Sequence, residues 1–149
     1  MDKQPGLTII VKTVTRLIIW MIFLYGAYII FHGHLSPGGG FGGGVILALG
    51  LLSVLLAYGR DFTLRWLNLK FLKSLEASSI TLFLAAGLMG MVLGEVFLSN
   101  FLAKGTLFSL WSSGFLPILN IFIGVKVGMS LFLVVLALAE FDVEKGAEE

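Results

Sequence analysis

The chain has 149 residues, of which 58% are apolar and only 13% are charged, and its formal net charge is +1. Soluble domains contain roughly 45–50% apolar and about 25% charged residues, so a water-soluble chain of this length could not bury so much apolar surface. Cysteine is absent, which excludes disulfides, thiolate metal sites and thiol catalysis. The ten basic residues form no single patch, so nothing indicates a nucleic-acid partner.

Four apolar segments are long enough to cross a lipid bilayer, which takes about 20 residues in a helix. They cover residues 6–31, 42–58, 77–98 and 117–139. Hardly any polar face is left on them for water to wet, which favours spanning helices over buried helices of a soluble protein. We therefore predict an all-α membrane protein made of a single four-helix transmembrane domain.

The first segment begins after Pro5, a residue that suits the first turn of a helix because it lacks an N–H group. Lys12 and Arg16 lie one helical turn apart and can extend toward the lipid headgroups. The apolar run is longer than a signal-peptide core and ends without a small-residue cleavage pattern. We therefore expect a first span rather than a cleaved leader.

A glycine-rich stretch joins the first span to the second: Gly33 to Gly44 reads Gly-His-Leu-Ser-Pro-Gly-Gly-Gly-Phe-Gly-Gly-Gly. Glycine permits positive φ and close approach of another backbone. At membrane depth, non-helical backbone is tolerated only where protein or a water cavity pairs its polar groups. The stretch therefore predicts either tight packing or a lined cavity, with a flexible outer turn as the alternative. No Gly-Lys-Ser/Thr follows, which argues against a phosphate-binding loop.

Two histidines lie at the start of this stretch. His32 and His34 lie at the outer mouth of the first span, where they could exchange protons near neutral pH or simply hold the turn by hydrogen bonds. A zinc site would need further ligands, and the sequence offers none beside them.

The third span carries one charged residue, Glu95. It lies about 27 Å along the helix from the inner end, near the outer interface. A carboxylate within a span faces protein or water, so Glu95 is a candidate for ion relay or a carboxylate that reaches the outer headgroups. Before this span, residues 62–75 mix basic residues with Trp66 and Phe71, as expected at a headgroup interface. Residues 99–116 form an aromatic outer segment that we expect at the interface or against a neighbouring protein.

The fourth span carries Lys126, which lies roughly 14 Å past Pro117 and so near the bilayer midplane. A lysine at that depth needs a carboxylate, a cavity or backbone carbonyls. No acidic residue of this chain is expected at the same depth, so we expect the partner on another subunit. Ion passage and a static inter-subunit ion pair remain open for Lys126, with lipid exposure as a third alternative.

Small residues in the third and fourth spans predict close helix packing. Gly124 and Gly128 form a Gly-x-x-x-Gly face, and Lys126 stands on the opposite side of that helix. The third span has a comparable stripe at Ala86, Gly90 and Gly94. We expect spans three and four to associate through these two faces.

The basic residues give the orientation of the chain. Eight of them fall on one side of a four-span topology and only Lys104 falls on the other. The positive-inside rule then places both the N-terminus and the C-terminus in the cytoplasm. The acidic tail, residues 140–149, is expected to be solvated there and partly disordered.

The glycine-rich motif resembles the signature of the B subunit of Mrp-type (also called Mnh) multisubunit sodium/proton antiporters. That family has homologous subunits in the membrane arms of energy-converting hydrogenases and related respiratory complexes. Its pattern is Gly-His, a short spacer, Pro-Gly-Gly-Gly-Phe, one variable residue and Gly-Gly. The matching positions are Gly33, His34, Pro37, Gly38, Gly39, Gly40, Phe41, Gly43 and Gly44, with Gly42 in the variable place.

The resemblance implies a small accessory subunit in a cation-translocating complex of the prokaryotic cell membrane. Its partners would be the other membrane subunits of an Mrp-type antiporter or hydrogenase-like complex, and the complex would move Na⁺ and H⁺. By the same resemblance, Pro37 and Phe41 are functionally sensitive, either at the ion or in holding the fold. Which of the two kinds of complex contains the chain stays open.

Three classes of function can be compared. An accessory transport subunit and a non-conducting assembly subunit both agree with the sequence. An intramembrane enzyme does not, because no serine–histidine or cysteine nucleophile, paired aspartates, haem attachment sequence or nucleotide site occurs. We therefore expect no catalytic residue, metal or cofactor in this chain. Proton relays are usually chains of ionisable groups, so this chain is expected to act only within a larger complex.

Overall fold

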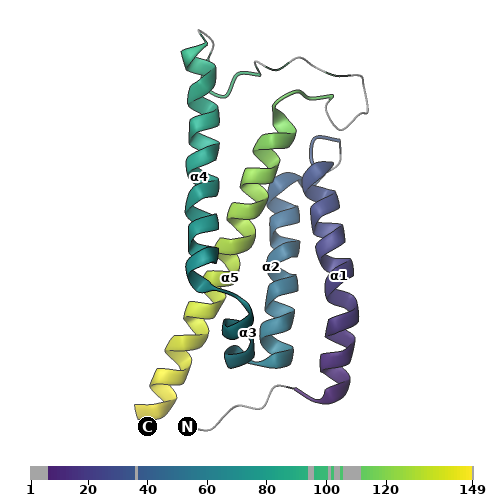
Figure 1. The fold of residues 1–149 in the computed structure, drawn as a ribbon, viewed down its shortest axis with the longest axis vertical. Coiled ribbons are helices and arrows are strands. Elements are labelled where there is room, and N and C mark those ends of the chain that lie inside the picture. The colour runs from purple at the N-terminus through teal and green to yellow at the C-terminus, as the bar shows by residue number, and fades with distance from the viewer. Residues whose placement is uncertain are drawn as a thin grey trace.

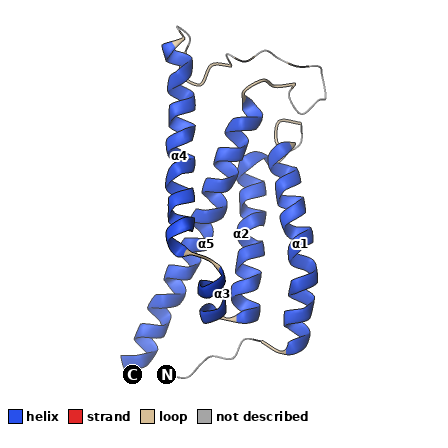
Figure 2. Cartoon of the chain, in the orientation of Figure 1, coloured by secondary structure: helices blue, strands red, loops and turns tan. Residues whose placement is uncertain are grey.

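The computed structural model describes residues 7–35, 37–93, 96–100, 102, 105 and 112–148, with side chains described as far as residue 139. Within these ranges the chain is helical, without strands (Figures 1 and 2). The helices are α1 (Ile9–Phe31), α2 (Gly39–Tyr58), α3 (Arg60–Trp66), α4 (Leu69–Val92) and α5 (Leu116–Glu148). Four of them are long and apolar enough to cross a membrane. The predicted all-α fold with four spans is confirmed.

The long helices form a bundle in which α2 is central. It packs against α1 on one side and α5 on the other, and α1 also touches α5 at one end. Helix α4 packs against α5, and the short α3 packs beside the end of α2. Figure 1 shows α5 crossing the bundle at a tilt, so that it lies beside α2 at its start and beside the beginning of α4 further along.

Glycines let α2 approach both of its neighbours closely. A Cβ on Gly43 would lie 2.5 Å from Ile30 Cγ1 of α1, and a Cβ on Gly44 would lie 2.6 Å from the Gly124 carbonyl oxygen of α5. Small residues at helix interfaces give the close van der Waals contact on which helix association in lipid depends. Adjacent glycines therefore face different helices, which makes α2 the centre of the bundle.

Larger side chains fill the bundle near α3. Leu51 of α2, Leu72 of α4 and Phe132 of α5 form a buried cluster, in which Phe132 is fully buried. Thr63 of α3 is also fully buried, and its hydroxyl donates to the Gly59 carbonyl at 2.9 Å. This cluster holds the start of α4 against α5, which matters for the site described below.

Helix α4 begins and ends earlier than the third expected span. It starts at Leu69 rather than residue 77, because the Asn68 side chain caps it by accepting hydrogen bonds from the N–H groups of Lys70 and Phe71. It ends at Val92 rather than residue 98. Beyond it, the Leu98 N–H donates to the Gly87 carbonyl at 3.3 Å, so the chain folds back along α4.

The bounds of the other helices differ little from the predicted ones within the membrane and more at the C-terminal tail. Helix α1 starts at Ile9 rather than residue 6, and α2 starts at Gly39, inside the glycine-rich motif, rather than at residue 42. Helix α5 continues to Glu148. The expectation of a partly disordered tail over residues 140–149 is therefore wrong for the backbone up to Glu148, which is helical.

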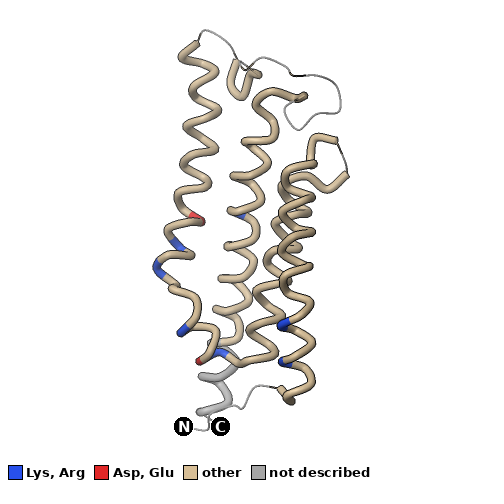
Figure 3. Tube along the Cα trace, turned by 45° about the vertical axis from the view of Figure 1, so that its right-hand side comes forward, with Lys and Arg blue, Asp and Glu red and all other residues tan. Residues whose placement is uncertain are grey.

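Basic residues gather at one end of the bundle, the end that holds α3 (Figure 3). We call it the basic end; it is defined by Lys12, Arg16, Arg60, Arg65, Lys70 and Lys73. The glycine-rich turn between α1 and α2 lies at the opposite end. Among the described basic residues, Lys126 stands apart because it lies within α5, away from this end.

Candidate functional site

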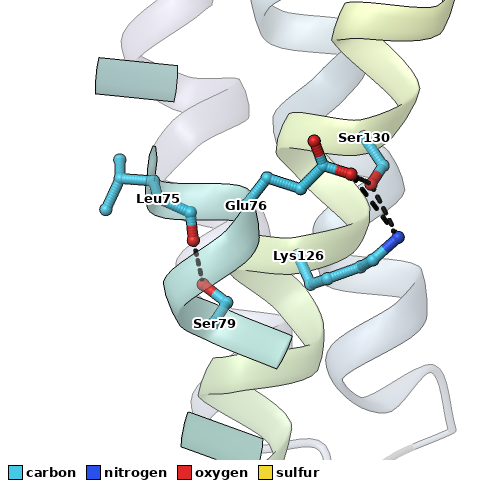
Figure 4. A network of polar contacts seen from close by, with 5 residues as sticks. All are labelled: Leu75, Glu76, Ser79, Lys126 and Ser130. Carbon is cyan, nitrogen blue, oxygen red and sulfur yellow. Dashed lines mark hydrogen bonds and ion pairs between the residues drawn. The ribbon is translucent and has the colours of Figure 1, made fainter. Parts of the chain in front are cut away.

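The polar cluster within the bundle consists of Lys126, Ser130 and Glu76 (Figure 4). The Lys126 ammonium donates a hydrogen bond to the Ser130 hydroxyl, with Nζ 2.8 Å from Oγ. The Ser130 hydroxyl in turn donates to Glu76 Oε1. Nζ of Lys126 and Oε1 of Glu76 are 3.6 Å apart, so the two charges also form an ion pair.

Two helices bring these groups together. Lys126 and Ser130 are four residues apart in α5, which places them on one face of the helix. Glu76 is in the second turn of α4, about 10 Å from its first residue. Lys126 is about 15 Å past the first residue of α5, close to the middle of the roughly 30 Å of hydrocarbon that a span crosses.

The cluster lies between two open pockets along the groove between α4 and α5. The larger one, about 630 Å³, extends from Lys126 toward the basic end. It is lined by Lys73, Glu76, Lys126, Ser130, Leu133, Val134 and Ala137. The smaller one, about 210 Å³, lies on the other side of Lys126, and its walls are apolar apart from Ser79 and Lys126 itself. Lys126 is the residue that both cavities share.

We expected the partner of Lys126 on another subunit, and that expectation is wrong. The acidic partner is Glu76 of the same chain. Glu76 falls just before the predicted third span, which began at residue 77, and just after residues 62–75, which were assigned to the headgroup interface. The Asn68 cap and the buried Leu72 extend α4 through that charged segment, so Glu76 enters the bundle.

The expected pairing of the two glycine faces is also wrong. The face with Gly124 and Gly128 packs against α2 and α1: a Cβ on Gly124 would lie 2.5 Å from Ile30 Cδ1, and one on Gly128 would lie 3.2 Å from the Gly44 carbonyl oxygen. On α4, Gly90 faces Ser99 of the returning chain. Because the glycine face of α5 turns to α2, the opposite face with Lys126 turns to α4.

The glycine-rich turn packs around Asn120 of α5. A Cβ on Gly33 would lie 2.8 Å from Asn120 Nδ2, and one on Gly40 would meet the Asn120 backbone. Two further glycines have positive φ, +128° at Gly38 and +59° at Gly39, a region that other residues rarely adopt. The turn thus combines tight packing with a backbone path that favours glycine.

Other motif residues point away from this packing. Phe41 is 64% exposed and Pro37 is exposed, so neither lies at the Lys126 cluster. Gly42, at the variable position, would have nothing within 4 Å of an added Cβ. The outward position of Phe41 makes it available to lipid or to a neighbouring subunit.

The remaining candidates are not part of the cluster. His34 is half-buried in the turn, and His32 has its Nδ1 3.0 Å from the Tyr28 carbonyl oxygen and its ring stacked on Tyr28. Glu95 lies outside the described residues, as does half of the outer segment 99–116. Ion relay through His34 or Glu95 stays a prediction.

Sequence reasoning missed Glu76, Ser130 and Asn120. The spacing of four residues between Lys126 and Ser130 is a visible signal, since it predicts a shared helix face. A second visible signal is Asn120, a polar residue within an apolar span. Nothing in the sequence aligned Glu76 with Lys126. Among the described residues, no three His, Asp or Glu side chains form a group that could hold a metal ion.

A family model described as "Domain related to MnhB subunit of Na+/H+ antiporter" matches residues 10–133. An uncharacterized protein of Methanocaldococcus jannaschii is 34% identical over 128 residues, which cover 80% of this chain and 48% of that protein. A Staphylococcus aureus (strain Newman) protein named as antiporter subunit mnhB2 is 30% identical over 93 residues, 62% of this chain and 65% of that protein. The chain thus spans between about half and just under two thirds of the length of these relatives.

One solved structure is similar in both sequence and fold. It is the membrane-bound sulfane sulfur reductase, described as an archaeal respiratory membrane complex. One of its chains matches with a TM-score of 0.76 and 33% sequence identity, over 91% of this chain and 59% of that chain.

Proposed function

This chain belongs to the family of domains related to the MnhB subunit of Na⁺/H⁺ antiporters, and from that premise we propose that it is an accessory membrane subunit of a multisubunit sodium/proton antiporter module. Its family and its four apolar spans make it a multi-pass protein of the prokaryotic plasma membrane. Its relatives include an antiporter subunit and a chain of a respiratory membrane complex. Other membrane subunits are its partners in this proposal, and a redox-driven complex is one setting for the module.

The observation that carries a transport role is the Lys126–Ser130–Glu76 cluster. Charged groups within a span cost about 2.5–3.5 kcal/mol each by insertion scales, and those that are kept often belong to ion pathways. Here the pair borders an open groove that runs toward the basic end and does not lie in a sealed core. An ion pair that only joined two helices would need no such cavity, so the geometry favours a role in ion passage.

We also propose that the basic end faces the cytoplasm. Six of the basic residues define this end, and the positive-inside rule associates such an excess with the cytoplasmic side. The cavity beside Glu76 would then admit water from the cytoplasm.

The direct experiment measures sodium-dependent proton movement in liposomes that contain the whole complex. Complexes that carry Lys126→Ala or Glu76→Gln should assemble and yet lose transport by roughly tenfold or more, equivalent to about 1.4 kcal/mol in the barrier. Lys70→Ala is the matched control, because Lys70 is an exposed lysine at the basic end that does not line the cavity.

The alternative is a non-conducting assembly subunit, and the exposed Phe41 favours contact with a neighbour. If Lys126→Ala and Glu76→Gln leave the transport rate intact, the transport role is wrong and this alternative stands. Phe41→Ala should then lower the yield of assembled complex more than either charge variant does.

A further inference from the structure

Ser130 stands between the two charges of the cluster as donor to one and acceptor from the other. The Lys126 ammonium nitrogen and the Glu76 carboxylate oxygen are 3.6 Å apart, longer than the 2.7–3.2 Å of protein N–H···O hydrogen bonds. Through Ser130 the connection is continuous, because its hydroxyl accepts from Lys126 at 2.8 Å and donates to Glu76. Figure 4 shows the three side chains meeting at this point.

The hydroxyl of Ser130 differs from comparable hydroxyls in the bundle. Serine and threonine within helices commonly donate to the carbonyl of the preceding turn. Ser53, Ser79, Thr63 and Thr81 all do so here, each to the carbonyl four residues earlier. Ser130 instead donates its proton across to another helix, onto a carboxylate.

We propose that Ser130 is a proton-relay residue, which passes a proton from the Lys126 ammonium to the Glu76 carboxylate at the end of the cavity between α4 and α5. An N–H bond of Lys126 breaks and its proton binds the Ser130 oxygen. The O–H bond of Ser130 breaks in the same step, and that proton forms an O–H bond with Glu76 Oε1. Lys126 becomes a neutral amine, Ser130 is again a hydroxyl, and Glu76 becomes a carboxylic acid.

The charge balance suits a site inside a bilayer. The ion pair becomes a neutral pair, so the net charge of the cluster is zero before and after the step. Glu76 then releases its proton to water in the open groove of about 630 Å³, where Lys73 is the other charged side chain. The neutral Lys126 amine takes up a replacement proton from water on the side of the smaller pocket, which Lys126 also lines. This second transfer restores the ion pair. On the far side of Lys126 the small cavity has apolar walls apart from Ser79, whose hydroxyl is bonded to the Leu75 carbonyl at 2.6 Å.

The inference rests on the proposed transport function, and one set of reconstituted complexes separates the two. Ser130→Ala removes the bridging hydroxyl but keeps both charges, whereas Ser130→Thr keeps a hydroxyl at the same place. Ser53→Ala is the matched control, since it removes a helical hydroxyl that donates to the Leu49 carbonyl in α2, away from the cavity. The readout is sodium-driven proton movement, recorded beside the yield of intact complex.

We expect Ser130→Ala to slow proton movement on the order of a hundredfold, the lower end of what a positioned proton-transfer group contributes. Ser130→Thr should restore most of the rate, and Ser53→Ala should match the wild type. A normal rate in Ser130→Ala, beside a loss in Lys126→Ala, overturns the relay and leaves the transport role standing. Equal losses in Ser130→Ala and Ser130→Thr also overturn the relay. Normal rates in all cluster variants overturn both.

Infrared difference spectra of the wild-type complex test the relay independently of how Ser130→Ala assembles. Imposing a sodium gradient should produce the carbonyl band of a protonated carboxylic acid, and this band should be missing in Glu76→Gln. A wild-type complex that transports without any such Glu76 band would overturn the relay.

Discussion

At the scale of residues, the site depends on one lysine in an apolar helix and on the carboxylate that pairs with it. A buried charge that has lost its partner is far more costly than a pair, so Lys126 and Glu76 depend on each other. The pair is only partly shielded, with side chains 39% and 31% exposed. Part of their attraction is therefore screened wherever water fills the adjoining cavity.

The mutual dependence of the two charges can be measured by a double-mutant cycle. Lys126→Ala leaves Glu76 without its counter-charge, so we expect it to lower the thermal stability of the complex more than Lys126→Ala with Glu76→Ala does. The coupling energy should lie toward the lower end of the roughly 0.5–3 kcal/mol found for contacting residues, because the pair is partly exposed. Strictly additive effects on the melting temperature would contradict the ion pair.

At the scale of elements, glycines determine which helix each face meets. Gly43 faces α1 and the next residue, Gly44, faces α5. Gly124 and Gly128 of α5 complete the same interface. Because this interface fixes the rotation of α5 about its own axis, it also turns Lys126 toward α4. Packing on one side of α5 thus positions the charge on the other side.

The central interface can be tested with two neighbouring glycines. Gly44→Ala would place a methyl group 2.6 Å from the Gly124 carbonyl oxygen, and a backbone atom cannot move aside, so the free energy of unfolding should fall by about 1–3 kcal/mol. Gly42→Ala is the control, since nothing lies within 4 Å of its added Cβ, and alanine should stabilise the helix by roughly 0.5–1 kcal/mol.

Thermal unfolding of both variants in lipid nanodiscs makes the comparison. The melting temperature should drop for Gly44→Ala and stay level or rise for Gly42→Ala. A similar drop in both would mean that general helix effects, rather than close approach of α2 and α5, set the stability.

At the scale of the whole molecule, the charged residues that the structure describes gather at the basic end of the bundle, opposite the glycine-rich turn. The cavity beside Glu76 extends toward the basic end. The orientation of the chain in the membrane therefore determines from which side water reaches the cluster. A measurement of the topology thus also tests the proposed mechanism.

The absence of cysteine makes the orientation simple to measure. Asp61→Cys is exposed on α3 at the basic end, and Leu35→Cys is exposed in the turn at the opposite end. A membrane-impermeant maleimide added to intact cells should label Leu35→Cys and spare Asp61→Cys, and inverted vesicles should give the reverse. Labelling of Asp61→Cys in intact cells would contradict a cytoplasmic basic end.

The sequence by itself determined that this is a membrane protein. Hydropathy is a property of each local stretch of sequence, and a helix of about 20 apolar residues has the length that spans a bilayer. The sequence also determined the family, through a run of adjacent residues, Pro37 to Gly44. Lys126 could be singled out in the same way, since a charge within a span is visible along the chain.

Only the tertiary structure determined which residues Lys126 contacts. Its contacts depend on where α4 begins and on how α5 is rotated, and neither is a local property. Asn68 caps α4 before a charged segment that sequence reasoning assigned to the interface, and Gly124 turns α5 toward α2. Glu76 and Ser130 are 54 residues apart in sequence, so their meeting with Lys126 follows from helix packing rather than from composition or hydropathy.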